Sequence, residues 1–192
     1  MSHRSLLVIL AAAVAALQIG FLSWTISGRA SVLRDGREVL LKVEPIDPRD
    51  LLRGDYVTLG YEIMNLPAEL FGAAPAGDPD YSAKPVWVVL RKGADGVFHP
   101  ASAALDRLAL KDVQPDDVVI RGTTNGWPTA GGPVFAQYGL ERFYLPEGEG
   151  KQIEKDMRER PFFVVASVAE DGSAQIKAFR DGETVLYEEP YY

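Results

Sequence analysis

A long apolar segment at the N-terminus constrains this chain more than any other feature of its sequence. It runs from Leu6 to Ile26, with Gln18 as its main polar interruption. A helix of that length spans roughly 30 Å, the thickness of the hydrocarbon core of a bilayer. Trp24 lies near its far end, where an indole favours the membrane interface. The pattern predicts a membrane anchor over residues 1–30 that contacts the bilayer through residues 5–27.

A cleaved signal peptide is the alternative interpretation of the same segment. Gly28-Arg29-Ala30 offers a small-x-small cleavage site, but the apolar run is longer than the usual signal core of about 7–15 residues. Basic residues flank both ends of the run, and the higher Lys/Arg count after it would favour a cytoplasmic C-terminal side. We expect the following domain to be exported, because large domains are translocated with little regard to flanking charge.

The remaining chain, residues 31–192, is acidic and contains no cysteine. With Arg4 and Arg29 in the leader set aside, 27 acidic residues face 18 basic ones. An acidic surface repels phosphate backbones, so nucleic acid is not an expected partner. The absence of cysteine excludes disulfides, thiolate catalysis and cysteine-ligated metals. About 160 residues suffice for one hydrophobic core, and we expect a single β-rich soluble domain.

Turn signals and short apolar runs recur along this domain. Asp-Gly pairs, the strongest short-range signal for β-hairpins, occur at Asp35-Gly36, Asp95-Gly96, Asp171-Gly172 and Asp181-Gly182. Strands are expected at Glu38–Pro45, Asp55–Ile63, Val86–Leu90, Val118–Ile120, Val134–Leu145, Phe162–Val168, Ala174–Phe179 and Thr184–Glu188. The pattern predicts a mainly β fold, a barrel or sandwich of antiparallel hairpins, after the single transmembrane helix.

One or two short helices complete the prediction. Lys151–Arg160 carries apolar residues only at Ile153 and Met157, an i,i+4 pair, and Pro161 follows it. A second helical turn is expected within Ala103–Leu110.

The stretch PIDPRDLLRGDYVTLGY, residues 45–61, combines a charged turn with a strand. Asp47 suits a helix N-cap, Pro48 the first helical position and Gly54 the residue after the last turn. In the strand that follows, Leu59 and Tyr61 alternate onto the inward face.

Asp55 begins that same inward face, where a carboxylate requires a partner. Arg49 and Arg53 are the nearest candidates. A structural ion pair and a functional carboxylate both fit this arrangement, because both perturb the pKa of an acid.

Two ordered motifs resemble a known family. GDYVTLGY at Gly54–Tyr61 is similar to the pattern Gly-Asp-Tyr-x-x-Leu-x-Tyr of the GDYXXLXY protein family, and YGLERFYLPEGEG at Tyr138–Gly150 resembles that family's second block. The resemblance implies a bacterial membrane-anchored protein without established activity, often encoded beside multispanning membrane proteins. We therefore expect a single-pass protein of the bacterial inner membrane with a periplasmic domain, and a multispanning membrane protein as a partner.

Alternation along the second block predicts its two faces. Tyr138, Leu140, Arg142 and Tyr144 would share one face, and Gly139, Glu141, Phe143 and Leu145 the other. Glu147 and Glu149 either favour the N-terminus of the next helix or line a cleft with Arg142.

These observations favour a binding or accessory subunit for a membrane partner. The candidate binding residues are Asp55, Arg53, Arg49, Tyr61, Arg142 and Glu147. No catalytic residue, metal ligand or cofactor is predicted, and His99 is expected in a loop without a triad companion. A hydrolase is the alternative, with either paired carboxylates or a degenerate signal-peptidase-like pair of Ser31 with Lys42 or Lys84.

Overall fold

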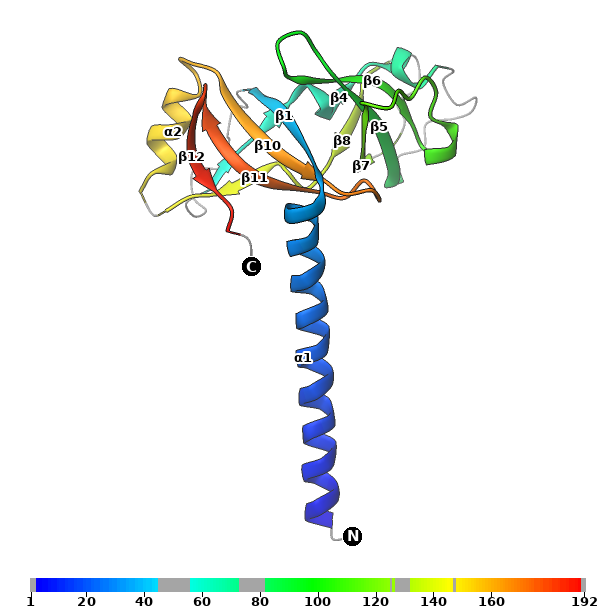
Figure 1. The fold of residues 1–192 in the computed structure, drawn as a ribbon, viewed down its shortest axis with the longest axis vertical. Helices are drawn as coiled ribbons and strands as arrows, with labels where there is room; N and C mark the ends of the chain where they lie inside the picture. The colour runs from blue at the N-terminus through cyan, green and yellow to red at the C-terminus, as the bar shows by residue number, and fades with distance from the viewer. Residues whose placement is uncertain are drawn as a thin grey trace.

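The computed structural model describes residues 3–44, 56–72, 82–124, 126, 132–146 and 148–190. In this part of the chain, one long helix leads into a domain of antiparallel sheets with one further α-helix (Figure 1). The predicted fold class, a β-rich domain behind an N-terminal apolar helix, is confirmed.

Helix α1 (His3–Asp35) projects from the domain as a straight rod (Figure 1). Side chains from residue 7 to residue 29 are exposed, and the helix is long and apolar enough to cross a membrane. Its final turns enter the domain, where Ala30, Val32 and Leu33 are buried. The helix thus continues past residue 30, while the division into two domains at that residue stays a prediction.

The first sheet has the strand order β12 (Thr184–Glu188), β11 (Ala174–Asp181), β10 (Phe162–Val168), β1 (Arg37–Glu44) and β3 (Gly60–Tyr61). The last three predicted strands are confirmed as β10, β11 and β12, which pair with one another as consecutive antiparallel hairpins. On β1, the apolar residues that alternate along the predicted strand, Val39, Leu41 and Val43, are 0%, 1% and 5% exposed. Alternation alone therefore predicted which face of this strand is buried.

The second sheet has the order β4 (Asn65–Leu66), β8 (Val134–Gln137), β7 (Val118–Thr124), β5 (Lys84–Lys92) and β6 (Phe98–Ala104). At its centre, β5 buries Val86, Val88, Val89 and Leu90 completely. A continuous apolar run, such as the one predicted as a strand at Val86–Leu90, is typical of a strand covered on both faces.

A two-stranded ribbon of β2 (Tyr56–Thr58) and β9 (Arg142–Tyr144) completes the strands, and all three sheets contribute to one hydrophobic core. Short 3₁₀ turns lie at η1 (Glu62–Met64), η2 (Ala68–Phe71) and η3 (Arg107–Ala109). The predicted helix at Lys151–Arg160 is α2 (Gly150–Asp156), with Ile153 and Met157 buried and a turn from Met157 to Glu159. The helical turn predicted within Ala103–Leu110 is only η3, because Ala103 and Ala104 pair with β5.

The Asp-Gly prediction is confirmed at three hairpins and wrong at the fourth. Gly96, Gly172 and Gly182 lie in the β5–β6, β10–β11 and β11–β12 turns. At Asp35-Gly36 the chain passes directly from α1 into β1 instead. A Cβ atom on Gly36 would lie 2.5 Å from the Val32 carbonyl oxygen, so this glycine permits the close approach of the helix end to the sheet.

Candidate functional site

The two sequence blocks, far apart along the chain, pair with each other. Tyr56 of β2 lies opposite Tyr144 of β9 in an antiparallel register. Three residues after Tyr56, the Leu59 N–H donates to the Glu141 carbonyl oxygen (2.9 Å). The first block therefore forms its ladder with the second block.

A reciprocal pair of buried tyrosine hydroxyls locks the two blocks together. Tyr61 donates to the Leu140 carbonyl oxygen (2.9 Å), and Tyr138 donates to the Ile63 carbonyl oxygen (2.7 Å). The two rings are only 2% and 7% exposed. Burial, and to a lesser degree the charge of Glu141, raises the pKa of both hydroxyls, which keeps them protonated as donors. We call Leu59, Tyr61, Tyr138, Leu140 and Glu141 the motif clasp.

Glu141 builds the turn that the clasp requires. Its carboxylate accepts the N–H groups of Tyr138 (2.5 Å) and Gly139 (3.2 Å). Gly139 has a φ of +78°, a conformation that favours glycine. This turn separates β8 from β9, so the single strand predicted for Val134–Leu145 is wrong.

The break also corrects the predicted faces of the second block. The four residues predicted to share one face are divided: Tyr138 and Leu140 are buried, whereas Arg142 and Tyr144 are exposed, and Phe143 takes the inward position. The turn shifts the alternation by one residue, which a period-two reading of the sequence does not allow for.

The outer face of the ribbon carries an exposed aromatic and cationic cluster, which we call the ribbon face. The Tyr56 and Tyr144 rings lie 5.9 Å apart, and the Arg142 guanidinium lies 5.6 Å from the centre of the Tyr56 ring. Tyr144 is 73% exposed. Tyrosine and arginine are the residue types most enriched among the energetically dominant positions of protein interfaces.

The residues predicted as a binding site are distributed unevenly over this structure. Tyr61 belongs to the core through the motif clasp, whereas Arg142 belongs to the ribbon face. The other four candidates, Asp55, Arg53, Arg49 and Glu147, lie outside the described residues, as does the charged turn of residues 47–54. Their roles stay predictions.

His99 was not chosen as a candidate because it was expected in a loop; that prediction is wrong, since the residue lies on strand β6. Its Nδ1 is 2.6 Å from a Glu62 carboxylate oxygen, and its Nε2 is 3.5 Å from an Asp95 oxygen. Glu62 directly follows the first motif, so this His99 cluster joins that motif to the β5–β6 hairpin. No spacing in the sequence signals the contact, since Glu62 and His99 are 37 residues apart. Among the residues that the structure describes, no group of three His, Asp or Glu side chains is arranged to hold a metal ion.

The His99 cluster makes stability depend on pH. The hydrogen bond to Glu62, opposed by partial burial and supported by Asp95, raises the pKa of His99. The contribution is fully present below the unfolded-state value of about 6.5 and is lost as the pH rises through the folded-state pKa. We expect His99→Gln to destabilise the protein at about pH 5.5 and progressively less above about pH 7. Thermal unfolding of both proteins across this range checks the trend, and a difference that grows with pH would contradict it.

The residues nominated for a Ser/Lys hydrolase lie on three different elements: Ser31 on α1, Lys42 on β1 and Lys84 on β5. The Ser31 hydroxyl donates to the Gly28 carbonyl oxygen within α1 (2.8 Å). Lys42 lies five residues into β1 from Arg37, about 17 Å further along the strand direction. Neither observation favours a Ser/Lys mechanism.

Comparisons with known proteins agree with the two motifs. The family model described as GDYXXLXY protein matches residues 18–179, which include the end of the apolar segment, both blocks and most of the β-rich domain. Neither the curated proteins nor the solved structures contain a match. The long match, together with the pairing of both blocks in space, identifies the chain: it belongs to the GDYXXLXY protein family.

Proposed function

We propose that this protein is a single-pass protein of the bacterial inner membrane, whose periplasmic domain is a binding or accessory subunit for a membrane partner. The anchor is supported by the length and apolar character of α1. Cleavage after Ala30 would cut inside the helix and remove a residue buried against the domain. This disfavours the signal-peptide interpretation.

The continuity between helix and domain carries the proposal. The Ser167 hydroxyl, fully buried, donates to the Val32 carbonyl oxygen near the end of α1 (2.6 Å). Gly36 N–H donates to the same oxygen (3.1 Å), and α1 packs on both β10 and β11. The junction contains no linker, so the domain keeps a fixed orientation relative to the helix. A fixed orientation suits a partner in the same membrane, because both components then meet in one geometry.

The ribbon face is the surface we assign to this partner. It presents aromatic rings and a guanidinium on a short ribbon whose inner side is held by the motif clasp. Such a pre-ordered surface loses little conformational entropy on binding. The family resemblance suggests that the partner is a multispanning membrane protein.

Site-specific photo-cross-linking tests the proposal in intact membranes. A photoreactive phenylalanine analogue at Tyr144 is expected to cross-link a membrane protein, and Arg142→Ala is expected to reduce the yield several-fold. Phe135, an aromatic residue on β8 that is 60% exposed, is the matched control position and should give no such product. Equal cross-linking at both positions, or none at Tyr144, would contradict the assignment of the ribbon face.

A further inference from the structure

A tryptophan with two arginines close to its ring lies on the second sheet, away from the ribbon face. Trp87 on β5 lies directly opposite Arg121 on β7. The Arg121 guanidinium is 5.8 Å from the centre of the Trp87 ring, and the Arg107 guanidinium from η3 is 5.3 Å from it. Trp87 is half-buried, while both arginines are exposed. We call these three residues the arginine–tryptophan stack.

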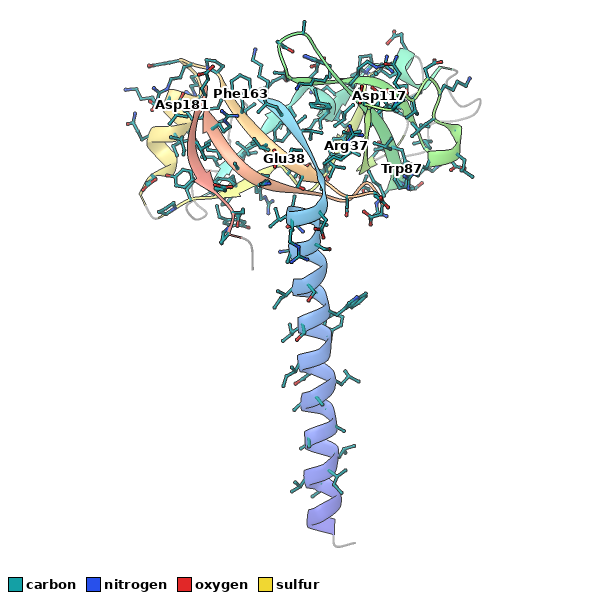
Figure 2. All side chains as sticks on the ribbon, viewed as in Figure 1. Arg37, Glu38, Trp87, Asp117, Phe163 and Asp181 are labelled. Carbon is teal, nitrogen blue, oxygen red and sulfur yellow. The ribbon has the colours of Figure 1, made fainter. Side chains whose placement is uncertain are left out.

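The stack lies beside the end of the anchor helix. Arg107 and Asp35, the last residue of α1, line the same hollow of about 380 Å³, together with Glu170. The Arg107 guanidinium donates to the Glu170 carbonyl oxygen in the β10–β11 turn (2.9 Å). Figure 2 shows Trp87 at the lower edge of the domain, on the side from which α1 leaves.

The length of α1 outside the domain sets the distance of this side from the bilayer. The apolar run ends at Ile26, and the domain already buries Ala30. Four helical residues span about 6 Å. The headgroup layer on each side of the hydrocarbon core is itself about 5–8 Å thick. The domain side around α1 therefore lies at the level of the headgroups.

The hollow beside the stack carries both signs of charge: it is lined by Arg37 and Arg107 and by the acids Asp35, Asp117 and Glu170. Asp35 pairs with Arg34 (3.4 Å) and Asp117 with Arg91 (2.7 Å). Arg29 on α1 adds a guanidinium one residue before Ala30. Two nearby acids are engaged within their own turns: Asp106 accepts the Leu108 N–H (3.0 Å), and Asp171 accepts the Ser173 hydroxyl (2.6 Å).

One of those acids also interacts with the stack. Hydrogen bonds from Ser173, followed by the charge of Arg121, lower the pKa of Asp171. Within the part of the chain that the structure describes, the Arg107 guanidinium forms no ion pair; it donates to the Glu170 carbonyl oxygen, which carries no charge. Leu108, next to Arg107, is 93% exposed. A large exposed apolar side chain beside cationic and indole groups is typical of residues at a membrane interface.

We infer that the arginine–tryptophan stack is a lipid-binding surface, which holds the domain against anionic headgroups of the bilayer that α1 crosses. Arg107 and Arg121 bind headgroup phosphates, Trp87 lies at the level of the headgroups, and Leu108 enters the boundary between headgroups and acyl chains. Screening by salt weakens such contacts. The inference rests on the membrane anchoring proposed above and is independent of the partner.

Fluorescence quenching in lipid nanodiscs tests this surface on the full-length chain. Trp24→Phe and Trp127→Phe leave Trp87 as the only tryptophan. Lipids with a nitroxide on the headgroup are expected to quench Trp87 at least two-fold more strongly in phosphatidylglycerol discs than in phosphatidylcholine discs. High salt and the double variant Arg107→Gln, Arg121→Gln should abolish the difference.

Arg158→Gln, an exposed arginine after α2, is the matched control and should leave the quenching unchanged. Equal, weak quenching in both lipids would overturn the inference, as would an unchanged signal in the double variant that retains its circular dichroism and unfolding temperature. If α1 is not a membrane anchor, the chain will not co-elute with nanodiscs of either lipid. This result differs from a failure of the lipid-binding surface, in which the chain co-elutes but the quenching does not depend on the lipid.

Discussion

Replacing Tyr61 and Tyr138 together by phenylalanine is expected to lower the free energy of unfolding by about 2–6 kcal/mol. Each substitution removes one hydroxyl and leaves a buried carbonyl oxygen, that of Leu140 or that of Ile63, without its donor. An unsatisfied buried acceptor costs about 1–3 kcal/mol. Denaturant unfolding of the detergent-solubilised chain, with both single variants and the double variant, measures the loss and the coupling between the two bonds.

Tyr144→Phe is the control for these substitutions. Its ring is 73% exposed, so loss of the hydroxyl should change the stability by no more than about 0.5 kcal/mol. The clasp tyrosines would prove unimportant for folding if their variants were as mild as this one. Stability losses confined to Tyr61 and Tyr138 would show that the buried tyrosines of the two blocks hold the fold, whereas the exposed Tyr144 does not.

The first sequence block, GDYVTLGY, therefore contains residues with two different roles. Leu59 and Tyr61 are 0% and 2% exposed, and their main-chain and hydroxyl contacts go to the second block. Tyr56 points to the other side and contributes its ring to the ribbon face. The motif thus combines residues that hold the fold with one that is available to a partner, and Asp55 is the next residue to place experimentally.

Local patterns predicted much of the fold. The alternation of Val39, Leu41 and Val43 identified a buried strand face, and three Asp-Gly pairs identified hairpins. These signals act over a few residues, because side chains alternate with a period of two and tight turns need particular backbone conformations. The apolar segment predicted a membrane-length helix through its own length and composition, which need no distant contact.

Contacts between residues far apart in the sequence account for the predictions that were wrong or missing. Asp35-Gly36 carries the hairpin signal, but α1 continues to that point because β10 and β11 cover its last turns. The Glu62–His99 contact depends on the approach of η1 to β6, which no periodicity encodes. The arginine–tryptophan stack likewise draws on two strands and a 3₁₀ turn. The candidate site was therefore less predictable than the strands that build it.

The largest effect of a single substitution is expected at Gly172, in the β10–β11 turn. Its φ is +80°, and a Cβ atom there would lie 2.8 Å from the Trp87 ring and 3.0 Å from the Arg121 backbone nitrogen. The Gly172 carbonyl also accepts the Arg121 N–H (2.8 Å), which joins the first sheet to the second. Left-handed strain of about 1–2 kcal/mol adds to about 1–3 kcal/mol of overpacking. Gly172→Ala should therefore cost about 2–5 kcal/mol, measured by denaturant unfolding.

Gly182→Ala isolates the backbone part of this cost. Gly182 occupies the neighbouring β11–β12 turn with a φ of +57°, but no atom lies within 4 Å of its added Cβ. Only the strain of about 1–2 kcal/mol is then expected. Equal losses at the two glycines would mean that the turn conformation alone matters. A larger loss at Gly172 would show that the β10–β11 turn is packed against Trp87 and Arg121 too closely to accept a methyl group. It would also mean that the arginine–tryptophan stack is held in place from the sheet that carries the anchor helix.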